Sequence, residues 1–176
     1  MGIRIRWVRR MIWRSITALG LLVLLGMSLP ARGENKCPWL NEATASSLLD
    51  APATGAYTGI GQFQPGTCTF STHGEGGTRT LTIVVEIPLD AHAREGAMKE
   101  QCGSDALSIR AIGNEAWICR ASEQHGRGSS LVVGRVRNQV FSIELSSTIK
   151  KDPMLDWDRL QSRSYLAAEQ VSGNLF

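Results

Sequence analysis

Four cysteines, at positions 37, 68, 102 and 119, constrain the fold of this chain more than any other feature of its sequence. In an exported protein, four cysteines are most simply two disulfides, and they permit three pairings. A zinc site is not favoured, because there is no Cys-x-x-Cys pair and no His-x-x-x-His spacing. A lipid anchor on Cys37 is not favoured either, since Glu34-Asn35-Lys36 precede it where a lipobox would place Leu and small residues. Whether any cysteine is a nucleophile depends on a nearby histidine, which the linear sequence does not show.

The first 33 residues have the order of a secretory signal peptide. Residues 1–14 carry five arginines and no acid, residues 16–29 are apolar, and Ala31-Arg32-Gly33 places small residues where a signal peptidase cuts. This apolar run is shorter than the about 20 residues that a membrane-spanning helix needs. We therefore predict cleavage after Gly33; the alternative is an uncleaved N-terminal anchor.

The net charge of the chain is dominated by this segment. Six of the 19 basic residues and none of the 16 acidic ones lie in residues 1–33, which leaves 13 basic against 16 acidic and turns a net charge of +3 into −3. The basic character therefore belongs to the export signal and is no evidence for nucleic-acid binding. Residues 34–176 are enough for one domain with its own core.

Hydrophobic periodicity and capping residues predict three helices separated by strands. Asn41 would cap a helix that ends at Asp50-Ala51-Pro52, Asp90 would cap AHAREGAMKEQC before Gly103, and Asp152-Pro153 would open a long C-terminal helix. Alternating apolar residues predict strands at 68–73, 78–87, 106–112 and 116–122, and a last hairpin with its turn at Asn138-Gln139. An edge strand is expected around 57–63, within a stretch rich in Gly and Pro.

The last hairpin allows a test of strand register. A two-residue turn at Asn138-Gln139 would pair Val136 with Phe141, Gly134 with Ile143 and Val132 with Leu145. These apolar or small residues would then share one face, and a slip by one residue would mix the two faces.

The predicted order of elements is helix, strands, helix, strands, helix, which is typical of an α+β domain. We expect a single antiparallel sheet with the helices packed on one face. Within that arrangement we favour the disulfides Cys37–Cys68 and Cys102–Cys119, because each would tie a helix end to a nearby strand. On the chain-entropy model each would contribute about 3–4 kcal/mol.

Four stretches carry a family resemblance: CPWLNEATASSLL, the Cys-x-Phe strand at 68–70, GNEAWIC and AAEQVSGNLF. Together they resemble a group of small exported bacterial proteins, some of which are cell-envelope lipoproteins of unknown function. The resemblance covers nearly all of residues 34–176 and implies the fold, but it supplies no catalytic residue. This chain lacks the lipobox of the lipoprotein members, so their membrane tethering is not implied.

No stretch of the sequence has the pattern of a known catalytic or cofactor site. His73-Gly74-Glu75 lacks a third metal ligand at usable spacing, which favours a solvated hairpin turn. Gly59-Ile60-Gly61 is not followed by a helix, so a phosphate loop is excluded. There is no Gly-x-Ser-x-Gly, although a hydrolase stays open because triads assemble from distant positions. We expect no metal, no cofactor and no catalytic residue.

The sequence favours an exported, non-catalytic binding domain of the bacterial cell envelope, periplasmic or secreted, with an envelope protein or an anionic ligand as its partner. No nucleic acid and no stable membrane insertion after signal cleavage are expected. The alternative is a secreted enzyme inhibitor that docks through a loop such as THGEGGT (72–78). 

Side chains along a strand point alternately to the two faces of a sheet. This alternation predicts one candidate binding surface, a shared sheet face that carries Arg110, Arg120, Arg135 and Arg137. Arginine forks suit carboxylate and phosphate groups. The simpler interpretation is a solvated face whose arginines pair weakly with neighbours such as Glu144.

Overall fold

The structure is a computed structural model that describes residues 36–59, 64–74, 76–121 and 128–176. The chain divides into two compact units, residues 1–34 and 35–176, and all described residues belong to the second. The predicted signal peptide lies outside the described residues, so its cleavage stays a prediction. No helix among the described residues is both long and apolar enough to cross a membrane.

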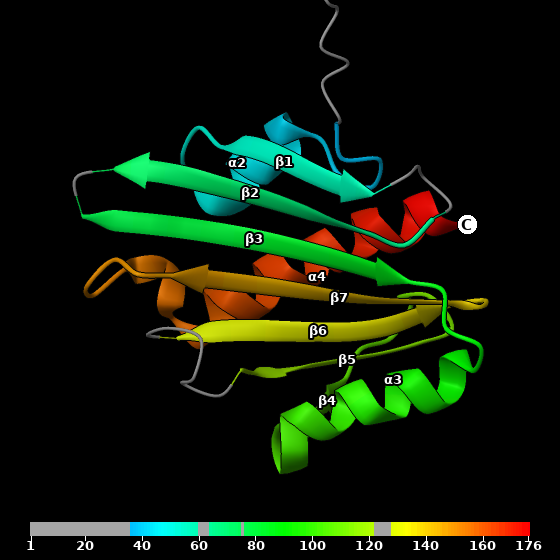
Figure 1. Ribbon diagram of the computed structural model, residues 1–176. Helices are drawn as coiled ribbons and strands as arrows, with labels where there is room; N and C mark the ends of the chain where they lie inside the picture. The colour runs from blue at the N-terminus through cyan, green and yellow to red at the C-terminus, as the bar shows by residue number, and fades with distance from the viewer. Residues whose placement is uncertain (1–35, 60–63, 75, 122–127) are drawn as a thin grey trace, which may run out of the picture. The chain divides into compact units, whose positions relative to one another are not determined.

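Seven antiparallel strands form one sheet in the order β1-β2-β3-β7-β6-β5-β4 (Figure 1). This confirms the predicted single antiparallel sheet of an α+β domain. The strands are β1 Thr54–Gly59, β2 Gly66–Gly74, β3 Gly77–Glu86, β4 Leu107–Ser108, β5 Glu115–Arg120, β6 Ser129–Val136 and β7 Gln139–Ser147. The strand predicted over 106–112 is reduced to the two residues of β4, because Ala111 and Gly113 adopt positive φ angles of 63° and 57° and turn the chain.

The described residues contain three α-helices, α2 Glu42–Leu49, α3 Ala91–Lys99 and α4 Trp157–Leu175. The predicted caps of the first two are confirmed, since Asn41 accepts a hydrogen bond from the Thr44 amide and Asp90 accepts one from the Ala93 amide. The prediction for the third was wrong by four residues. Asp152 opens only the 3₁₀ turn Pro153–Leu155, and Asp156 caps α4.

The main core lies between one face of the sheet and helices α2 and α4. Buried side chains alternate along the central strands, with Leu81, Ile83 and Val85 on β3 and their partners Leu145, Ile143 and Phe141 on β7. The helices and the segment before α2 cover them with Trp39, Leu48, Leu49, Leu160, Ala167, Ala168, Val171 and Leu175. 

Helix α3 packs on the opposite face of the sheet (Figure 1). Met98 of α3 forms a second, small cluster with Val133 of β6 and Val140 of β7. The prediction that the helices share one face is therefore wrong for α3. The physical reason is that β6 is buried on both faces at this end of the sheet, as the fully buried neighbours Val132 and Val133 show.

The β6–β7 hairpin has the predicted faces but a register shifted by two residues. The turn residues are Arg137 and Asn138, and Val136 pairs with Gln139, Gly134 with Phe141 and Val132 with Ile143. The Phe141 ring lies over Gly134, where an added Cβ would come within 2.5 Å of Phe141 Cζ. Because a shift of two residues preserves parity, the apolar residues stay on the core face.

Candidate functional site

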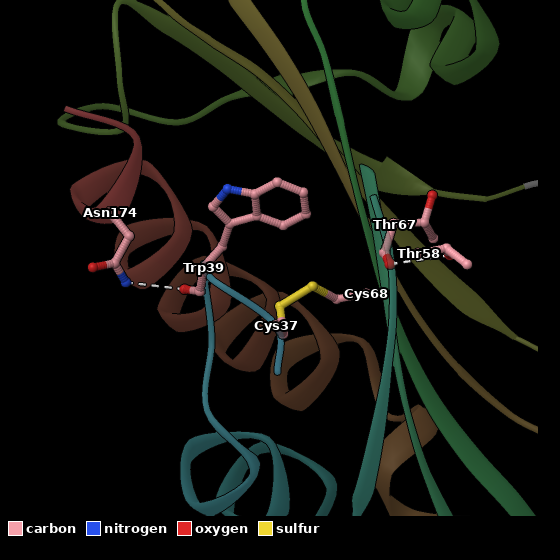
Figure 2. Close-up of a disulfide and its surroundings, with 6 residues drawn as sticks. All are labelled: Cys37, Trp39, Thr58, Thr67, Cys68 and Asn174. Carbon is pink, nitrogen blue, oxygen red and sulfur yellow. Dashed lines mark hydrogen bonds between the residues drawn. A yellow bond between two sulfur atoms is a disulfide. The ribbon is translucent and has the colours of Figure 1, made fainter. Parts of the chain in front are cut away.

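Both predicted disulfides are present, Cys37–Cys68 and Cys102–Cys119, with Cα–Cα distances of 5.6 and 5.5 Å. The first ties the segment before α2 to β2 (Figure 2), and the second ties the 3₁₀ turn Glu100–Asp105 to β5. Since all four cysteines are bridged, none is available as a nucleophile. Two disulfides indicate an oxidising compartment outside the cytoplasm.

A surface groove of about 240 Å³ lies beside the first disulfide. Figure 2 shows Asn174 turned toward the Trp39 backbone, and its Nδ2 donates to the Trp39 carbonyl at 3.0 Å and to the Gln170 carbonyl at 3.1 Å. The Trp39 ring is fully buried and meets the Tyr57 ring edge to face. The Asn174 amide is therefore engaged in holding α4 to the segment before α2, and the Trp39 ring is part of the core.

A buried ion pair joins Arg79 of β3 to Asp152. Arg79 Nε and Nη2 donate to the two carboxylate oxygens, each at 2.8 Å. Asp152 also accepts from the Ser147 hydroxyl at 2.6 Å and from the Met154 amide at 3.0 Å. Burial alone would raise the pKa of Asp152, but these hydrogen bonds outweigh it and hold the pKa at about 2.

Arg79 of this ion pair also caps the C-terminal end of α2, together with Arg163 of α4. Arg79 Nη1 donates to the Leu49 carbonyl at 2.7 Å, and Arg163 of α4 donates to the Leu48 carbonyl at 2.6 Å and pairs with Asp50. These carbonyls have no partner within the helix, and the two arginines supply one. With its donors and acceptors engaged in this way, the pair is a structural connection between α2, β3 and the chain before α4.

The four arginines predicted to share a sheet face do not do so. Arg120 lies over the Trp157 ring of α4, 4.7 Å from its centroid, whereas Arg135 donates to Glu95 of α3 on the opposite face. Arg137 lies in the β6–β7 turn, 5.7 Å from the Phe176 ring, and Arg110 is exposed beyond the end of β4. The parity argument failed because β4 stops at Ser108 and because β5 aligns Glu115, not Arg120, with Arg135.

The sheet face opposite α2 and α4 carries rows of hydroxyl side chains. Residues directly opposite on neighbouring strands point to the same face, so the strand pairings define each row from β1 across β2, β3 and β7 to β6. The first row is Thr54, Ser71, Thr80, Ser146 and Ser129; the second is Ala56, Thr69, Thr82, Glu144 and Leu131; the third is Thr58, Thr67, Val84, Ser142 and Val133. We call these three rows the hydroxyl face.

Most of the hydroxyl face is at least partly exposed on β1, β2, β3 and β7. Glu144 is its one ionisable side chain, and the face has no Lys or Arg. On β6, Ser129 is 2% exposed and its hydroxyl has no hydrogen-bond partner among the described residues, and Val133 is buried against α3. The exposed part of the face is therefore polar and nearly uncharged.

A second polar group, which we call the α3 cluster, consists of His92 and Glu95 of α3, Glu115 of β5 and Arg135 of β6. Arg135 Nε donates to Glu95 Oε2 at 2.8 Å, and Arg135 Nη2 lies 3.6 Å from Glu115 Oε1. His92 Nδ1 lies 3.9 Å from Glu95 Oε2. Burial raises the pKa of Glu95, and the Arg135 hydrogen bond opposes that rise.

Sequence reasoning missed the α3 cluster. The signal that was available is the His92-x-x-Glu95 spacing, which places both side chains on one helix face. The third member, Glu115, comes from a strand and joins them only in the folded chain. Of the other sequence candidates, His73 is exposed at the end of β2, while Glu75 and Ile60-Gly61 lie outside the described residues.

No family model, curated protein or solved structure matches this chain. The resemblance to small exported bacterial proteins stays an expectation that rests on the four quoted stretches.

Proposed function

We propose that residues 34–176 are an exported, non-catalytic binding domain of the bacterial cell envelope, periplasmic or secreted, and that the hydroxyl face is its binding surface. The observation that carries this proposal is the alignment of exposed or half-buried Ser and Thr side chains in rows across the four strands β1, β2, β3 and β7, with no basic residue among them. The three rows contain one charged residue, Glu144. This is a low proportion, because about 25–35% charged residues is usual for a surface that keeps a domain soluble.

The chemistry of the hydroxyl face favours a neutral, extended polymer that itself carries hydroxyl and amide groups, such as a glycan chain. Each Ser or Thr hydroxyl both donates and accepts hydrogen bonds. Neighbouring strands are about 4.8 Å apart and same-face residues along a strand about 6.7 Å apart, so the hydroxyls repeat at regular spacings over the face. Nucleic acids and other polyanions need Lys and Arg contacts, which this face lacks. 

The test is sedimentation of the exported protein with insoluble peptidoglycan, cellulose and chitin. Thr80→Val and Thr82→Val together remove two central hydroxyls with little change in side-chain volume, and valine is favoured in strands. We expect this double variant to sediment severalfold less than the parent protein with the glycan that the parent binds. Ser162→Val on an exposed position of α4 is the control and should sediment like the parent.

Two results would refute the proposal. One is a parent protein that sediments with none of these glycans. The other is a Thr80→Val, Thr82→Val variant that folds normally and sediments as well as the parent.

A further inference from the structure

We propose that the α3 cluster is a binding site for a divalent transition-metal ion such as Zn²⁺, with His92, Glu95 and Glu115 as ligands. This inference concerns a different surface from the hydroxyl face and does not depend on the proposed function.

The three side chains already lie close to the arrangement that a metal ion needs. One ligand atom from each of His92, Glu95 and Glu115 lies within 4.8 Å of the other two. Ligand atoms around a tetrahedral zinc ion, at bonds of 2.0–2.2 Å, are about 3.4 Å apart. The side chains of His92 and Glu115 are 77% and 43% exposed, so both can rotate by the remaining ångström or so without disturbing the core.

A separate observation also favours a cation at this place. The side chain of Glu95 is only 1% exposed, and its Oε1 has no hydrogen-bond partner among the described residues. A buried acceptor without a partner is costly, more so when it belongs to a carboxylate. Oε2 is the Glu95 oxygen that lies 3.9 Å from His92 Nδ1 and accepts from Arg135, so a metal ion held by both carboxylate oxygens would give Oε1 its partner. Arg135 would then orient the ligand from outside the coordination sphere.

The charge and the ligand types favour a transition metal. Two carboxylates and one guanidinium leave a net charge of −1 when His92 is neutral, so a cation is attracted. Imidazole together with carboxylates suits Zn²⁺ and its first-row neighbours, whereas Mg²⁺ and Ca²⁺ prefer oxygen ligands alone. Three protein ligands leave a fourth position for water or for a ligand atom from a partner.

The experiment is a calorimetric titration of the metal-free exported protein with ZnCl₂ at neutral pH, accompanied by the visible spectrum of the Co²⁺ form. His92→Ala and Glu115→Gln change exposed side chains, so both variants are expected to fold. His73→Ala is the control, because His73 is exposed at the end of β2, away from the cluster.

We expect the parent protein and His73→Ala to bind one equivalent of Zn²⁺ with the same affinity. We expect each cluster variant to bind at least about tenfold more weakly and to lose the tetrahedral Co²⁺ bands, since it lacks one of three ligands. Absence of saturable binding by the parent would overturn the proposal. So would His92→Ala and Glu115→Gln variants that bind as tightly as the parent.

Discussion

Replacement of Asp152 by Asn should destabilise the domain far more than the loss of an equally well-formed ion pair on its surface. Asp152 is fully buried and joined to Arg79 by two hydrogen bonds of 2.8 Å each. Removal of one partner from a buried pair leaves an uncompensated charge and typically costs about 3–5 kcal/mol. The depressed pKa of Asp152 supports this scale, because a shift from 3.8 to about 2 corresponds to about 2 kcal/mol of preferential stabilisation of the carboxylate. We therefore expect a loss of about 3 kcal/mol.

The chain provides a matched control in the pair Arg94–Glu86. Arg94 also forms two hydrogen bonds to one carboxylate, at 2.6 and 2.8 Å, but the two side chains are 41% and 32% exposed. Exposed pairs contribute about 0–1 kcal/mol. Glu86→Gln should therefore lower the free energy of unfolding by less than about 1 kcal/mol, although the Arg94–Glu86 hydrogen bonds are as short as those between Arg79 and Asp152.

Urea unfolding of the disulfide-intact protein measures both variants. For small proteins the free energy of unfolding falls by about 1–3 kcal/mol per molar urea, so a loss of 3 kcal/mol lowers the midpoint by about 1–3 M. Equal midpoints for Asp152→Asn and Glu86→Gln would refute the argument that burial decides the contribution of the pair.

Three further predictions follow from single contacts. The pKa of Asp152 is lowered from 3.8 to about 2, so the carboxylate stabilises the fold above pH 3.8 and this stabilisation is lost as the pH falls toward 2. In urea unfolding at different pH values, Asp152→Asn should therefore show less loss of stability between pH 3.8 and 2 than the parent protein. Gly134→Ala should cost about 1–3 kcal/mol in the same assay, because the new Cβ would meet the buried Phe141 ring at 2.5 Å. Gly173→Ala, where a Cβ meets nothing within 4 Å, should instead be neutral or stabilising by up to about 1 kcal/mol; equal losses for the two would contradict the packing argument. Alkylation of the unfolded exported protein should label no cysteine, and reduction should lower its stability by about 2–5 kcal/mol; two labelled thiols by mass would contradict a pair of disulfides.

Features that depend on residues close together in the chain were predictable from the sequence alone. Alternation of apolar side chains identified the core face of the last hairpin, because side-chain direction in a strand repeats every two residues. The caps Asn41 and Asp90 marked where two helices begin, since a side-chain oxygen reaches an amide only three residues on. The order of helices and strands also favoured the correct pairing of four cysteines.

Features that depend on contacts between distant residues became visible only in the folded chain. The alternation of apolar residues is the same for β6–β7 registers that differ by two residues. The contact between Phe141 and Gly134 selects one of these registers. Asp152 followed by Pro153 has the pattern of a helix N-cap. The Asp152 carboxylate is instead bound by Arg79, 73 residues away in the chain, and α4 begins only at Trp157. Helix α3 lies on the face opposite α2 and α4 because β6 is apolar on both sides, and this placement brings Glu95 to Arg135 and Glu115. No local pattern encodes such contacts, since they form only when separate elements pack together.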